Sequence, residues 1–507
     1  MSIKYTLFVF VFILPLLSID ESRNNSTCLS DADCDPPFMI CSPNTQTCQH
    51  KPLFPLTVSE IIGTVLIVGL GSIATVAGLG GGVIVIPLIL LLFGVTIKEA
   101  AAISNVIILV NSTVKFINGF GKKDPLKPTK TLIDYHFVLM FNPVFIVSNV
   151  FGSILNKMLP SGYVLCGLIS MVLIVMVINI RNGIKKYKEE NEEVERQKLL
   201  KENLLGNDKD SEAIELKEKG KFSRIRPIDI TNAESDNDFN NKTGQPSQNR
   251  IYGTSPTHVL PHISMQQFND PEFKEILKNE GKDFNSKTFA LFSLTVFTVV
   301  FFSLLRGSRE FESIVGMEFC GGIFWLTLIL MIIFILAIAV YSTRLVHKEI
   351  AIKAANNHLM PHELNYDFKT TLRLNIVLFV FGVISNILGL GGALFIYPLF
   401  TGLGMQPVVV SYTALFMIFQ SKLVAVVLNY LGGLIIADLA IYFVVIMSVG
   451  SYFIVKKMNQ IIAKYKRQSL LTVLMVFVLA VSLIISPLYG YLEGSKSPDF
   501  WSFRSFC

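Results

Sequence analysis

The feature that most constrains this chain is a series of apolar runs, each long enough to cross a lipid bilayer. A bilayer core needs about 20 apolar residues in helical form. Ten long runs lie near residues 56–77, 96–120, 134–156, 160–181, 287–305, 320–343, 370–388, 405–431, 434–456 and 468–488. Two shorter runs, 82–93 and 392–403, follow glycine clusters and could either cross or turn back. The sequence therefore predicts an all-α integral membrane protein with about 10–12 membrane segments.

Composition and charge agree with a membrane environment. The 507 residues are 51% hydrophobic and 16% charged, with a mean hydropathy of +0.53. A soluble domain has a larger charged fraction. The net charge of +6 arises largely from lysines in loops beside apolar runs, as the positive-inside rule expects of cytoplasmic loops. We therefore expect the lipid bilayer, and not a nucleic acid, as the partner of this surface.

The N-terminal region indicates the secretory pathway, with the plasma membrane or an endomembrane as destination. Residues 1–18 resemble a signal peptide, with an uncleaved anchor as the alternative. Residues 19–54 form a luminal or extracellular segment with four clustered cysteines, expected to form two disulfide bonds of undetermined pairing: Cys28, Cys34, Cys41 and Cys48. Two overlapping glycosylation sequons precede them, at Asn24 and Asn25.

The rest of the chain divides by polarity into membrane regions and loops. We expect a first membrane repeat at 55–181, a cytoplasmic disordered insertion at 182–286, linking membrane helices at 287–343, a cytoplasmic loop at 344–369, a second membrane repeat at 370–488 and a luminal or extracellular tail at 489–507. The insertion is rich in Asn, Asp, Ser and Lys and has few apolar residues to bury. We interpret it as a passive linker, with a regulatory tail as the alternative.

An internal repeat relates the two membrane regions. The segment GLGGGVIVIPL begins at Gly78, and GLGGALFIYPL begins at Gly389, an offset of 311 residues. In the expected topology the first motif lies at the cytoplasmic end of its helix and the second at the luminal end. The two halves are then inverted repeats with glycine-rich helix breaks, a common architecture of secondary transporters.

Glycine-rich breaks can bind anions. Where a helix unwinds, the N–H groups that open the next helical segment are exposed, and its dipole favours negative charge. The alternative is that these glycines only allow close helix packing. The candidate substrate-binding glycines are Gly78, Gly80, Gly81, Gly82, Gly389, Gly391 and Gly392.

Lys115 and Lys422 lie deep in apolar helices that follow the two glycine motifs. A charged side chain at such depth is costly and therefore suggests a function. We predict that each half supplies one cation for an anionic substrate, although snorkelling or pairing with an acid are alternatives. Nearby polar residues complete the candidate site: Ser104, Asn105, Asn111, Ser112, Thr413, Gln420 and Ser421. Asp134 and Asp438 open later helices, where an acid is ordinary, so proton coupling through them is the less favoured interpretation.

The two glycine motifs, each followed by a long apolar helix, resemble the paired signatures of the sulfite exporter TauE/SafE family. The resemblance covers most of 56–181 and 370–488. It implies a membrane permease, with export of sulfite, a sulfonate or a related organic anion as the expected activity. The cysteine-rich segment and the long insertion go beyond the compact form of the family.

Together these features favour secondary transport of a small anion by alternating access. An anion channel is the alternative mechanism, and a membrane receptor or adhesion protein acting through the cysteine-rich segment is the alternative class. The sequence contains no HExxH, nucleotide-binding loop or paired metal-ligand spacing, so we expect neither an enzyme nor a metal or other cofactor. It identifies no coupling ion.

Overall fold

The computed structural model describes residues 39–41, 48–51, 53–95, 97–124, 127–205, 271–283, 285–308, 311–356, 368–388, 392–465, 469–494 and 501–503. The chain divides into two compact units. One consists of Met1–Lys188 and Asp270–Cys507, and the other of Glu189–Asn269. The first unit contains the apolar helices and every contact discussed below. The second is described from 189 to 205, where the chain is helical.

Helices dominate the described residues. They are α2 (Val58–Ala77), α3 (Gly82–Phe93), α4 (Ile97–Gly119), α5 (Tyr135–Met158), α6 (Ser161–Leu205), α8 (Pro271–Glu280), α9 (Ser286–Arg306), α10 (Gly322–Ala355), α11 (Phe368–Ile387), α12 (Ala393–Gly402), α13 (Pro407–Leu431), α14 (Ala437–Tyr465) and α15 (Ser469–Gly494). Within these residues, ten helices are long and apolar enough to cross a membrane, and α3 and α12 are shorter. The predicted all-α membrane fold is confirmed.

Two strands form a small hairpin ahead of the helices. β1 (Met39–Cys41) pairs antiparallel with β2 (Cys48–His50), with Cys41 opposite Cys48. Cys41 is disulfide-bonded, and so is Cys320, which precedes α10. Cys166 is free and exposed. The wider prediction for the cysteine cluster stays a prediction, because Cys28, Cys34 and the sequons at Asn24 and Asn25 lie outside the described residues.

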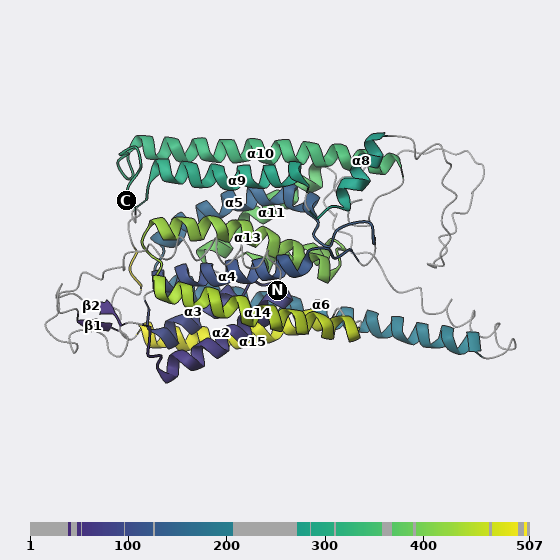
Figure 1. Cartoon of the computed structure of the whole chain (residues 1–507), viewed down its shortest axis with the longest axis horizontal. Coiled ribbons are helices and arrows are strands. Elements are labelled where there is room, and N and C mark those ends of the chain that lie inside the picture. Colours follow the sequence, from purple (N-terminus) through teal and green to yellow (C-terminus); the bar gives the residue numbers. More distant parts are fainter. Residues whose placement is uncertain are drawn as a thin grey trace, which may run out of the picture. The chain divides into compact units, whose positions relative to one another are not determined.

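The long helices of the first unit lie side by side (Figure 1). α10 packs against both α9 and α5, α11 packs on α5, and α13 and α14 both pack on α4. α4 is the most enclosed of the candidate spans, with 78% of its apolar window buried, compared with 17% for α6. Helices α4 and α13 are antiparallel, because Lys115 contacts Tyr412 near one end of the pair and Asn105 contacts Lys422 near the other.

Each short helix runs back along a long one. Gly63 of α2 faces Phe93 at the end of α3, and Gly71 faces Val85, so α3 returns toward the end of the bundle at which α2 begins. The second short helix behaves similarly with respect to α5. Gly392 packs on Phe145 and Phe400 packs on Phe137, whereas α11 runs parallel to α5. Both short helices therefore reverse the direction of the long helix before them.

Part of the predicted disordered insertion, 182–286, is helical. α6 continues to Leu205, and α8 forms just before α9. In α8, Phe273 and Ile276 are buried, with exposed fractions of 3% and 7%. The low apolar content of the whole insertion suggested disorder. In α8, however, Phe273 and Ile276 lie three positions apart on one helical face, which is enough to dock a short helix. The segment is thus helical at both ends, and the prediction of disorder stays a prediction for 206–270, which lie outside the described residues.

Candidate functional site

The first glycine motif breaks the α2–α3 hairpin through left-handed backbone. Gly78, Gly80 and Gly81 have φ values of +92°, +75° and +92°. Side chains with a Cβ rarely adopt this conformation, so glycine is needed here for backbone reasons. Gly78 ends α2 and Gly81 is the N-cap of α3. The motif thus places the carboxyl end of one helix and the amino end of the next close together inside the bundle.

Lys115 binds the carboxyl end of α2. Its Nζ donates a hydrogen bond to the Val76 carbonyl (3.1 Å), which also accepts one from Ser411 Oγ (3.1 Å). The ammonium lies 4.3 Å from the centre of the Tyr412 ring, and Lys115 is 1% exposed. A cation at this end of a helix interacts favourably with the helix dipole. No acid pairs with Lys115 in the part of the chain that the structure describes.

Tyr412 is itself held by polar groups. Its hydroxyl oxygen accepts hydrogen bonds from Asn459 Nδ2 (3.1 Å) and Lys122 Nζ (3.5 Å). Burial lowers the pKa of Lys122, which lies in the loop after α4. Two lysines therefore lie on one tyrosine, and the first break carries positive charge on its α13 side.

The amino end of α3 offers hydrogen-bond donors. The N–H groups of Gly81, Gly82 and Val83 make no hydrogen bond with any residue that the structure describes, as is usual for the first turn of a helix. The fully buried Asn111 lies nearby. Its Oδ1 accepts from Ser451 Oγ (2.5 Å), while its Nδ2 has no partner among the described residues.

Asn111 Nδ2 lies beside Gly71 of α2, which in turn faces Gly81 of the break. A Cβ added to Gly71 would lie 3.7 Å from this nitrogen, and one added to Gly81 would lie 3.4 Å from Gly71. Ser451 Oγ also forms a hydrogen bond with Ser72 Oγ (2.8 Å), so the Asn111 amide oxygen belongs to a chain of hydrogen bonds that joins α4, α14 and α2. An unpaired buried donor is costly. The first break therefore contains the α3 amino end, one free amide donor and, one helical turn from it, the Lys115 cation.

The second break is more completely satisfied in its described part. The N–H of Gly392, which has φ +82°, donates to Ser385 Oγ (2.5 Å). The Phe145 ring fills the space beside Gly392, since an added Cβ would clash with Phe145 Cζ. Gly389 and Gly391, also predicted to bind substrate, lie outside the described residues.

The two lysines lie at different levels. Lys422 Nζ donates to Asn105 Oδ1 (2.8 Å). Because Asn105 and Lys115 are ten residues apart on α4, the two cations are separated by about 15 Å along the helix axis. The two lysines, predicted from the sequence to lie at corresponding depths in one site, thus lie at different levels of the α4–α13 pair, and the structure does not bring them together.

Most of the other predicted polar residues bind the protein itself. Ser112 Oγ donates to the Ile108 carbonyl of its own helix (2.8 Å). Thr413 Oγ1 accepts from the Asp134 N–H (3.1 Å). Gln420 accepts from Asn142, and Ser421 accepts from Asn149 (2.6 Å). Thr413, Gln420 and Ser421 thus connect α13 to α5 and to the residue before it, whereas Ser104 Oγ and Gln420 Nε2 are buried without a partner among the described residues.

Several residues at the break were not predicted from the sequence. Ser411 and Tyr412 contact the carboxyl end of α2 and Lys115, and Ser451, which bonds Ser72, donates to Asn111. The polar run 411–413 at the start of an apolar helix was the available signal for the first two. No sequence pattern around Ser72 or Ser451 distinguishes these residues from other serines in membrane helices.

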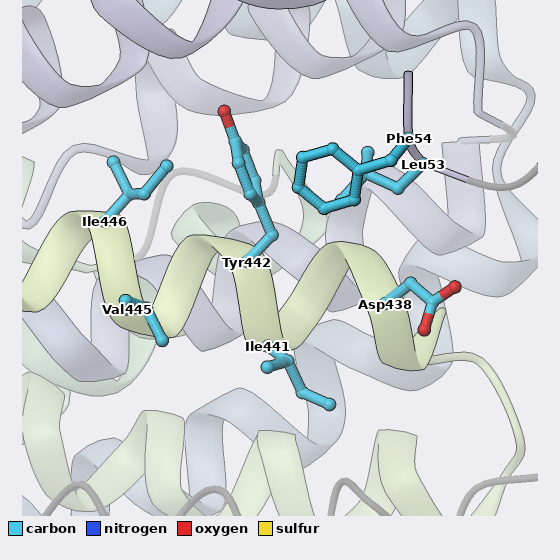
Figure 2. Close-up of a pocket in the computed structure, with 7 residues that line it drawn as sticks. All are labelled: Leu53, Phe54, Asp438, Ile441, Tyr442, Val445 and Ile446. Atoms are coloured by element: carbon cyan, nitrogen blue, oxygen red, sulfur yellow. The ribbon is translucent and has the colours of Figure 1, made fainter. Parts of the chain in front are cut away.

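A separate groove lies between the segment before α2 and the face of α14 (Figure 2). Its volume is about 470 Å³ and it is lined by Leu53, Phe54, Asp438, Ile441, Tyr442, Val445 and Ile446. Asp438 is its one acidic residue, and no basic residue lines it. An apolar groove with a carboxylate does not suit an anion, so the first break remains the better candidate site.

Comparisons with known proteins are consistent across the chain. The family model for the sulfite exporter TauE/SafE family matches residues 4–198. "Sulfite exporter TauE/SafE family protein 2" of Arabidopsis thaliana is 23% identical over 460 residues, covering 88% of this chain and 86% of the relative. Family protein 3 of the same plant is 22% identical over 495 residues, covering 97% and 91%. No solved structure matches.

Proposed function

Given that this chain is related to the sulfite exporter TauE/SafE family, as its glycine motifs predicted, we propose that it is a secondary transporter that exports a small anion. Sulfite, a sulfonate or a related organic anion is the substrate class. The observation that carries the proposal is the first break, where the buried Asn111 Nδ2 donor and the α3 amino end lie one helical turn from Lys115.

This arrangement suits an oxyanion chemically. Sulfite or sulfonate oxygens accept several hydrogen bonds at once, and the N–H groups of Gly81, Gly82 and Val83 with Asn111 Nδ2 supply donors. The α3 dipole and the Lys115 charge stabilise the anion, and both act strongly because the site is shielded from water. A bound anion would compensate the charge of Lys115 and satisfy the free amide.

The contacts between the halves support alternating access by inverted repeats. Gly78 of the first motif packs on Ser411 of α13, and Gly392 of the second packs on Phe145 of α5. Each break is therefore closed by a helix from the other half. Any movement of one half against the other changes both breaks at once, which is the geometric requirement for exposing a site to alternate sides.

Flux measurements in proteoliposomes test the proposal. The purified full chain is reconstituted, and uptake of sulfite, simple sulfonates and carboxylates is measured with and without the same anion inside. We expect saturable uptake that internal substrate accelerates, because counterflow requires a carrier. Flux without counterflow would indicate the anion channel, and the absence of flux for every anion would overturn the proposal.

A paired substitution tests the site. Asn111→Leu removes the amide at similar volume and should weaken apparent anion affinity about 5- to 10-fold, the value of one buried hydrogen bond. Asn118→Leu is the matched control, because Asn118 Nδ2 donates to the Val114 carbonyl of its own helix (2.9 Å). Equal affinities in the two variants would remove Asn111 from the site.

A further inference from the structure

Helix α8 is docked on the rest of the first unit by an apolar face, by the buried carboxylate of Glu280 and by an exposed ion pair between Glu272 and Lys348 of α10 (2.6 Å). Phe273 and Ile276 are buried, whereas Glu272 and Glu275 are exposed. Glu280, at the end of the helix, has a side chain that is 3% exposed. The carboxylate of a solvated linker would stay in water, because burying a charge is costly. The burial of Glu280 therefore indicates that α8 has a defined docking position.

Glu280 connects three elements. Its Oε1 lies 2.6 Å from Lys353 Nζ of α10, a side chain with no exposed surface, and its Oε2 lies 3.3 Å from Lys127 Nζ of the loop between α4 and α5. Its backbone carbonyl accepts from the Thr131 N–H (3.2 Å). His136 of α5 lies 3.9 Å from Oε1 and pairs with Glu349 of α10 (2.7 Å).

The charge of Glu280 is well compensated. Burial raises the pKa of this carboxyl, but Lys353, Lys130, His136 and Lys127 together outweigh burial and hold the pKa below its ordinary value. The carboxylate is therefore ionised at neutral pH. Removing one partner of such a buried pair leaves the other charge uncompensated, which strongly favours separation of the elements.

The loop that Glu280 holds is also attached to the first break. Lys130 pairs with Asp134 (2.9 Å), and the Asp134 N–H donates to Thr413 Oγ1 (3.1 Å). The two residues before Thr413 are Ser411 and Tyr412, which bind the Val76 carbonyl and contact Lys115. A continuous series of contacts thus joins α8, through residues 127–134, to the start of α13 and the candidate anion site.

We propose that α8 is a latch, and that Glu280 is the positioning residue through which it holds the 127–134 loop and the start of α13 closed over the first break. Release of α8 frees this loop and the first turns of α13, and the break opens more often on that side. The inference rests on the proposed function for its effect on transport, whereas the latch itself is a property of the contacts.

Hydrogen–deuterium exchange of the full chain tests the latch without reference to substrate. Glu280→Gln keeps the shape of the side chain and removes its charge. We expect amides in 127–134 and 410–413 to exchange roughly tenfold faster or more, from the loss of charge-assisted hydrogen bonds. The matched control is Glu275→Gln, which affects an exposed pair with Lys287 (3.8 Å) and should leave exchange unchanged.

A second variant covers the case in which Glu280→Gln fails to fold. Phe273→Ala removes the apolar contact of α8 and leaves every charge in place, so it should produce the same pattern of faster exchange. Faster exchange confined to α8, with 127–134 and 410–413 unchanged, would overturn the latch.

Anion flux separates the latch from the transport proposal. In proteoliposomes, Glu280→Gln and Phe273→Ala should raise the initial flux several-fold over Glu275→Gln, because opening limits many transport cycles. Equal flux despite faster exchange would overturn the role of the latch in transport. Faster exchange with no anion flux even in the unaltered chain would leave α8 as a structural latch and overturn the transport function instead.

Discussion

The two glycine breaks have similar sequences but different surroundings. At the first, the N–H of Gly81 has no partner among the described residues, whereas at the second the N–H of Gly392 donates to Ser385 Oγ. The residue equivalent to Ser385 at the repeat offset is Ala74, which has no hydroxyl. One side-chain oxygen therefore satisfies, at the second break, the N–H group that is left free at the first.

The two buried lysines repeat this contrast. Lys115 donates to a backbone carbonyl at a helix end and lies over an aromatic ring, while Lys422 donates to the side chain of Asn105. Lys115 lies one helical turn from the unpaired Asn111 Nδ2 beside the first break. An internal repeat can thus conserve backbone geometry while the chemistry of binding is concentrated in one copy.

The largest effect is expected from filling the second break. Gly392→Ala combines left-handed strain of about 1–2 kcal/mol with a clash against Phe145 that adds about 1–3 kcal/mol. We expect a marked fall in the thermal unfolding temperature of the detergent-solubilised protein. Gly404→Ala is the control, because Gly404 has φ +89° with no atom within 4 Å of an added Cβ. Equal shifts in the two variants would show that Phe145 does not close the second break.

The next effect separates the two cations. Lys115→Met should weaken anion affinity about tenfold or more, since it removes a buried charge beside the proposed site. Lys422→Met should change affinity by less than about threefold, because its ammonium lies about 15 Å away along α4. Binding is measured by titration of sulfite into each purified variant. A comparable loss in both would restore a shared site contributed by both halves.

A smaller effect is expected at the carboxyl end of α2. Ser411→Ala removes one of two hydrogen bonds to the Val76 carbonyl, and Lys115 still satisfies that oxygen. We expect a loss of about 0.5–1.5 kcal/mol in unfolding free energy and little change in affinity. A loss of affinity as large as that of Lys115→Met would place Ser411 among the substrate-binding residues.

The last prediction concerns the side of the membrane that each glycine break faces. Its variant should have almost unchanged stability. If the N-terminus is luminal, Asn24 or Asn25 carries a glycan and the four clustered cysteines are oxidised. Glycosidase treatment should then shift the mass of the unaltered chain, and a variant with both asparagines replaced by glutamine should not shift. Free thiols at all four cysteines in non-reducing mass spectrometry would reverse the expected sides of the two breaks.

The sequence predicted the spans and the glycine breaks because both depend on local composition and spacing. The buried depth of Lys115 was also visible, but its contacts with Val76 and Tyr412 were not, since these depend on how distant helices meet. The docking of α8 escaped prediction because its apolar face consists of two residues in a polar stretch. The disulfide bond of Cys320 escaped it because an isolated cysteine gives no pairing signal.

The contact between Val76 and Ser411 joins residues 335 positions apart. During biosynthesis, α2, α3 and α4 are therefore made long before the helix that closes their break. Until α13 is inserted, Lys115 and the end of α2 lack the Tyr412 ring and the Ser411 hydroxyl. Contacts this distant form late, so a premature stop anywhere before residue 411 leaves a buried cation incompletely packed. The incompletely packed Lys115 is then a defect by which membrane-protein quality control can recognise the truncated chain.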